Sequence, residues 1–167
     1  KILMFNDSIS IILADMIISA WELATIYINR LRNSDLHKKI KIDAIELNSP
    51  FWIIGHIAWT QYYLVLQTTK GSPSISWLED FKFGTSHERK NTWPTFEEIE
   101  KHMNIIHQES LTTVKSMTNG DFNKKFLNDS FENRKQAIYH MIRHESQHAG
   151  HLSWLCKLNG IWQKLQS

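Results

Sequence analysis

The sequence predicts an all-α protein built as a four-helix bundle. Four long segments repeat apolar residues at the spacing of amphipathic helices. The 167 residues include only 6 glycines and 3 prolines, which leaves few turns and favours long elements. No long segment alternates apolar and polar residues as a half-buried strand does, and residues 40–47 come nearest to that pattern.

The first two helices are marked by N-cap residues and by apolar periodicity. The first is expected to begin at the N-cap cluster of residues 6–8 and to stop near residues 33–35. Its predicted apolar positions are Ile9, Ile12, Leu13, Met16, Ile17, Ala20, Leu23, Ala24, Tyr27 and Leu31. The second is capped by Ser49, opens with Pro50 and runs to about Thr69, with Gly71 as its exit.

Capping boxes mark the last two helices. In the third, Thr95 pairs with Glu98, and Asn119 with Gly120 is expected to end the helix. In the fourth, Asn133 pairs with Gln136, and the helix continues to about Asn159. The predicted buried positions are Ile99, Met103, Ile106 and Val114 in the third helix, and Ala137, Ile138, Met141, Ile142, Ala149, Leu152, Leu155 and Cys156 in the fourth.

A long connection, residues 72–94, separates the second and third helices. Such a crossover often joins parallel neighbours in a bundle. Connections of this length are usually functional or disordered. The four aromatic residues of this one favour a functional connection over a disordered one. We expect Trp77, Phe81, Phe83 and Trp93 to pack against the helices.

Composition limits the protein's class and partners. The net charge is only +2 and both signs are mixed along the chain, so we expect neither a nucleic-acid partner nor a membrane partner. We find no uninterrupted apolar run of about 18 residues and no signal peptide. The single cysteine excludes an internal disulfide framework and a Cys-rich zinc site. We therefore expect one cytoplasmic domain that spans residues 1–167.

The nine histidines direct attention to a metal site. His140, His144 and His148 follow one another at four-residue spacing, which places neighbours on one helix face. His144 and His148 fall at or inside the apolar arc, whereas His140 and His151 turn toward solvent. His151 lies about 10.5 Å from His144 along the helix axis. A third ligand must therefore come from another helix.

His56 is the candidate third ligand, since it lies on the aromatic stripe of Trp52, Trp59 and Tyr63. Its position near a helix N-terminus disfavours the imidazolium, and a metal needs the neutral ring. A lone histidine is also a common packing residue, and this stripe can be core rather than a pocket wall. We interpret His37, His87, His102 and His107 as surface or packing residues, and Cys156 as an inert buried thiol.

Residues 144–148 also spell His-Glu-x-x-His, the zincin signature, with Glu145 as the general base. Against a zincin, no acidic residue follows Glu145 and no histidine stands six residues after His148. The alternative role for Glu145 is to accept a hydrogen bond from a ligand ring, for example that of His56. A role in proton transfer stays open.

Two strings resemble the DinB-like superfamily, which is related to DNA-damage-inducible and bacillithiol-transferase proteins. They are Gly-His-Ile-Ala-Trp at residues 55–59 and His-Glu-x-x-His-Ala-Gly-His-Leu at residues 144–152. The resemblance implies an up-down-down-up bundle and a homodimer. It also implies one divalent ion, nickel or zinc, held by His56, His144 and His148.

Two functions follow as hypotheses. The first is a metal-dependent enzyme that transfers a low-molecular-weight thiol to a small molecule, or hydrolyses a small molecule. Three histidines leave an open coordination position for such chemistry. The second is a non-catalytic, metal-binding stress-response bundle. The sequence assigns no catalytic residue.

Overall fold

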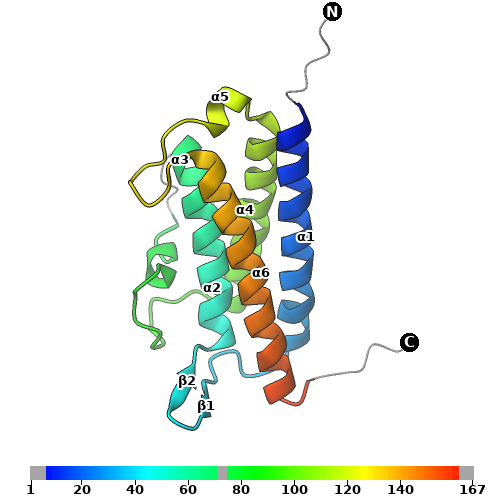
Figure 1. Ribbon diagram of the computed structural model, residues 1–167. Helices are drawn as coiled ribbons and strands as arrows, with labels where there is room; N and C mark the ends of the chain where they lie inside the picture. The colour runs from blue at the N-terminus through cyan, green and yellow to red at the C-terminus, as the bar shows by residue number, and fades with distance from the viewer. Residues whose placement is uncertain (1–6, 71–74, 162–167) are drawn as a thin grey trace, which may run out of the picture.

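The computed structural model describes residues 7–70 and 75–161, and it confirms an all-α protein (Figure 1). The long helices are α1 (Asp7–Leu31), α2 (Pro50–Gln61), α4 (Phe96–Ser116) and α6 (Arg134–Leu158). Shorter helical pieces are the π-helical turn η1 (Tyr62–Leu66), α3 (Gln67–Lys70), the 3-10 turn η2 (Leu78–Phe81) and α5 (Asn119–Phe122). The strands β1 (Ile40–Ile42) and β2 (Ile45–Leu47) form an antiparallel pair.

The four long helices lie side by side and enclose one apolar core (Figure 1). Helix α1 packs against α4 and α6, and α2 packs against the same two helices. Every residue of α2 is buried, so this helix has no solvent-facing side. A histidine on α2 therefore lies inside the protein whichever way its side chain points.

The predicted caps organise the helix starts. The Ser49 hydroxyl accepts a hydrogen bond from the Trp52 amide at 3.3 Å, and Thr95 with Glu98 forms a reciprocal capping box. Asn133 accepts from the Gln136 amide at 3.0 Å, but the Gln136 side chain donates to Glu132 instead of returning to the cap. The fourth helix therefore has half of its predicted box.

Two predicted features of local structure are wrong. The pattern of residues 40–47 came nearest to that of a strand, but no strand was predicted there. In the structure these residues form a β-hairpin, and Asp43 in its turn has a backbone conformation in the left-handed region. The third helix ends at Ser116, because Met117 is extended, and Asn119 with Gly120 lies inside the short helix α5. A second capping box, Thr118 with Asp121, starts α5.

Helix α1 buries a narrower face than its apolar positions predict. Ile12, Met16 and Leu23 are exposed, and the buried face is Leu13, Ala14, Ile17, Ala20, Ala24, Ile28 and Leu31.

By length and composition alone, Ile9–Leu31 could cross a membrane, although Asp15 and Glu22 interrupt its apolar run. Because α1 packs against α4 and α6, it forms part of the protein core.

The crossover packs down, as predicted, through most of its aromatic residues. The η2 turn lies against α2, and Phe81 is completely buried. Gly55 makes this contact possible, because a Cβ atom at that position would overlap the Phe81 ring. Phe83 is the exception, since 81% of it is exposed.

Candidate metal centre

The structure brings together the three histidines that the sequence singled out. His56 on α2 and His144 on α6 approach through their Nε2 atoms at 3.3 Å, although they are 88 residues apart in the chain. The His144 and His148 Nε2 atoms are 3.1 Å apart. Among the described residues, these three form a group whose ligand atoms all lie within 4.8 Å of one another.

These distances fit a metal ion. Nitrogens about 2.0–2.1 Å from a tetrahedral ion are roughly 3.3–3.4 Å from each other. The His56 Nδ1–H donates to the Phe81 carbonyl at 2.6 Å, so its Nε2 carries a bare lone pair toward the other two rings. Bare nitrogens held this close repel unless a proton or a cation lies between them. The group therefore suits a metal-binding protein.

Burial keeps the three rings neutral. It is the largest cause of a lowered pKa for each of them, and it brings the pKa of His144 to about 4. The pKa of His148 is lowered further by the neighbouring His144 and His56. Neutral imidazoles offer lone pairs at neutral pH, which is what ligation requires.

The second nitrogen of each ring has a different environment. The Phe81 carbonyl of η2 fixes the His56 ring, and this backbone acceptor carries no sequence signal. The His148 Nδ1 lies 3.3 Å from the Nδ1 of His151, which is exposed as predicted. The His144 Nδ1 is buried with no hydrogen-bond partner in the described part of the chain.

Glu145 is buried, but it does not bond His56. The Phe81 carbonyl occupies that role, and neither Glu145 carboxylate oxygen has a hydrogen-bond partner within residues 7–70 and 75–161. Burial raises the pKa of Glu145 to about 8, so the carboxyl is largely protonated at neutral pH. Glu145 also does not line the pocket described next, which speaks against the general base of a zincin.

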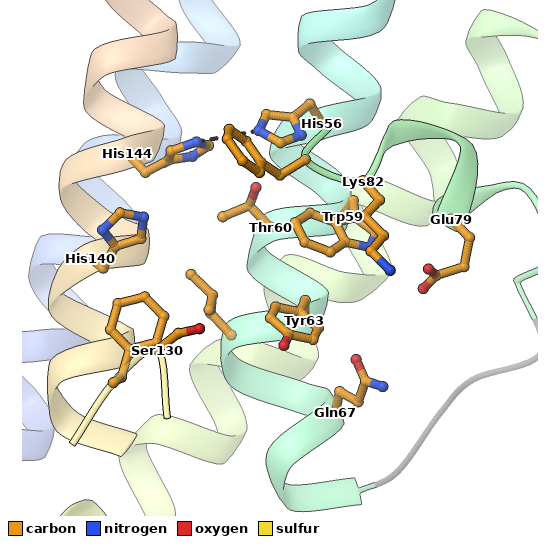
Figure 2. A pocket seen from close by; sticks show the side chains of 13 residues that line it. His56, Trp59, Thr60, Tyr63, Gln67, Glu79, Lys82, Ser130, His140 and His144 are labelled. Carbon is orange, nitrogen blue, oxygen red and sulfur yellow. Dashed lines mark hydrogen bonds between the residues drawn. The ribbon is translucent and has the colours of Figure 1, made fainter. Parts of the chain in front are cut away.

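A pocket of about 570 Å³ adjoins the histidines (Figure 2). His56 and His144 contribute to its wall, and Trp59 and Tyr63 line the α2 side. The aromatic stripe of α2 is therefore core at Trp52, which is 3% exposed, and pocket wall at Trp59 and Tyr63. The other residues that line it are Thr60, Leu64, Gln67, Glu79, Lys82, Phe83, Ser130, Phe131 and His140.

The sequence misplaced His140. It was expected to turn toward solvent, but its ring is half-buried and lines the pocket, 5.6 Å from the ring of His144. The i, i+4 spacing to His144 was the available signal. The ring of Phe131 also contacts the His140 ring, with centroids 5.1 Å apart. His107, interpreted from the sequence as a surface or packing residue, is a packing residue, since it is buried and stacks on Trp21.

Comparison with known proteins identifies a family for this chain. A family model described as the DinB superfamily matches residues 17–152, which include all three histidines of the group. No curated protein matches the chain.

Proposed function

The chain belongs to the DinB superfamily, and from this membership and the histidine group we propose that it is a metal-dependent enzyme. It transfers a low-molecular-weight thiol to a small molecule, or hydrolyses a small molecule. Within this proposal the fold is the up-down-down-up four-helix bundle that the family resemblance implies, with the crossover between α2 and α4. The course of the chain in Figure 1 supports that topology.

One observation carries the proposal: the ring nitrogens of three histidines, two of them buried and one half-buried, converge beside a pocket large enough for a small molecule. His56, His144 and His148 would hold one divalent ion, nickel or zinc. Three protein ligands leave a position open, as in catalytic sites rather than closed structural ones. A divalent ion there would lower the pKa of a bound water or thiol and supply a nucleophile at neutral pH.

Metal analysis of the purified protein tests the site. We expect about one nickel or zinc ion per chain, and a loss of most of it in His56→Ala and in His148→Ala. His102→Ala is the matched control, because its ring contacts Trp77 and the Glu98 carbonyl instead of the histidine group. Equal metal in wild type and in both site variants would contradict the proposal.

In the rival function the protein is not an enzyme, and the metal ion only joins α2 to α6. This function is favoured by the origin of the ligands, since His56 lies on one helix and the other two on its neighbour. In that case a chelator should lower the melting temperature, and no transfer of glutathione, cysteine or bacillithiol to a model electrophile should be found. Transfer that depends on the metal and on His56 would decide for the enzyme.

The homodimer and the cytoplasmic location stay predictions. For the dimer we propose the outer face of α1, where Ile12, Met16, Leu23 and Ile26 are exposed. An apolar face of this kind is typical of a surface that a partner covers.

A further inference from the structure

We propose that the pocket beside the histidines binds a flat, mainly apolar small molecule that carries a carbonyl-type oxygen, and that His140 donates a hydrogen bond to that oxygen. This inference rests on the proposed function, because it names the class of molecule on which the site acts. The support is the shape of the walls, the placement of charge and the tautomer of His140.

The two walls of the pocket are aromatic. On the α2 side the rings of Trp59 and Tyr63 are stacked, with centroids 4.9 Å apart and planes only 10° apart. On the α6 side lie the rings of Phe131 and His140. Figure 2 shows Trp59 and Tyr63 across the pocket from His140. Aromatic side chains on both sides favour a ligand with a flat ring over one with a puckered ring, because a flat ring packs well against both the edges and the faces of aromatic rings.

The charges of the pocket are confined to its exposed residues. Among the described residues that line the pocket, Glu79 is the acidic one and Lys82 the basic one, and both are exposed to solvent. The interior polar groups are uncharged. The Thr60 hydroxyl and the Gln67 carbonyl oxygen are buried without a hydrogen-bond partner in the described ranges. A ligand with an uncharged body suits this interior, since a buried charge without a partner is costly.

His140 is held in one tautomer. The Arg143 Nη2 lies 3.1 Å from the His140 Nδ1, and a guanidinium can only donate, so Nδ1 accepts. A neutral imidazole carries a single N–H, so the proton of the His140 ring lies on Nε2. The ring therefore offers a donor beside His144 (Figure 2).

Binding of benzamide, followed by NMR titration of the purified protein, tests the inference. Cyclohexanecarboxamide has the same amide on a puckered ring, and we expect it to bind at least fivefold more weakly. His140→Phe keeps a flat ring but removes the donor, and it should weaken benzamide binding by about three- to tenfold. His140→Gln should restore most of the affinity, and Tyr139→Phe, on the exposed side of the same helix, should leave it unchanged.

Several results would overturn the inference. Equal affinity for benzamide and cyclohexanecarboxamide would refute the flat ligand. Unchanged binding in His140→Phe, or a loss confined to Lys82→Met, would refute the donor. Repeating the titration after chelation separates this inference from the proposed function. Binding that keeps its dependence on His140 in a protein without a metal site supports the inference alone, whereas a normal metal content with no benzamide binding refutes the inference alone.

Discussion

Replacing His107 with phenylalanine should make the protein less sensitive to acid. His107 lies on α4 and is 4% exposed. Its ring stacks on Trp21 of α1 with centroids 4.3 Å apart, and the Gln61 side-chain amide lies 3.4 Å from its Nδ1. Burial lowers the pKa of His107 from 6.5 to about 4. The folded protein therefore keeps this ring neutral under conditions in which the unfolded chain has already bound a proton.

The sign and size of the effect follow from this difference in pKa. Below pH 6.5 the unfolded state binds more protons than the folded state, so stability is complete above that pH and falls as the pH drops toward 4. A difference of about 2.5 pH units corresponds to roughly 3 kcal/mol in total. At about pH 5 the loss amounts to roughly 2 kcal/mol, because the folded ring is still mainly neutral there.

Urea unfolding followed by far-UV circular dichroism, at about pH 7.5 and about pH 5 with a chelator present, measures this loss. Wild type should lose about 2 kcal/mol more than His107→Phe between the two conditions. His107→Gln serves as a second variant, since it also lacks an ionisable ring but keeps a polar partner for Gln61. The other buried histidines contribute equally to all three proteins. The same pH dependence in all three would refute the reasoning.

Three further predictions test the fold, the site and the assembly. Gly55→Ala should lower the free energy of unfolding by about 1–3 kcal/mol, because the new Cβ atom displaces the Phe81 ring. The metal content should also fall, because the Phe81 carbonyl holds the His56 ring. An unchanged melting temperature would contradict this prediction. Thr95→Ala removes the cap of α4 and should lower the free energy of unfolding in urea by about 1 kcal/mol. Thr95→Ser should keep nearly wild-type stability, and the metal content of both variants should change little. If α1 forms the dimer interface, Ile12→Glu with Leu23→Glu should give a monomer in sedimentation velocity, and a wild-type monomer would reject the dimer.

Local signals in the sequence were enough to predict the helices and one pair of candidate ligands. Ser49, Thr95 and Asn133 cap helices because their side chains bond amides only three residues away. The His144 and His148 rings share a helix face because they are one turn apart. The all-α class was predictable for the same reason, since periodicity over a few turns already distinguishes a helix from a strand.

The sequence predictions were wrong where the local pattern was weak or where it fitted more than one helix face equally well. Helix α1 carries apolar residues on more than one side, so its periodicity could not decide that Ala14 is buried and Ile12 exposed. The hairpin at residues 40–47 is short, and the π-helical turn of Tyr62–Leu66 has no recognised residue pattern. The end of α4 was misplaced because Asn119 and Gly120 suit a helix end but also suit the start of α5.

The sequence by itself indicated which histidines are candidate metal ligands and which of them are neighbours along a helix. Only the tertiary structure decided that His56 meets His144, that the Phe81 carbonyl orients it and that His140 lines a pocket. These contacts join helices and a crossover that are far apart in the chain. They depend on how whole apolar faces pack together, and no spacing within one segment encodes that.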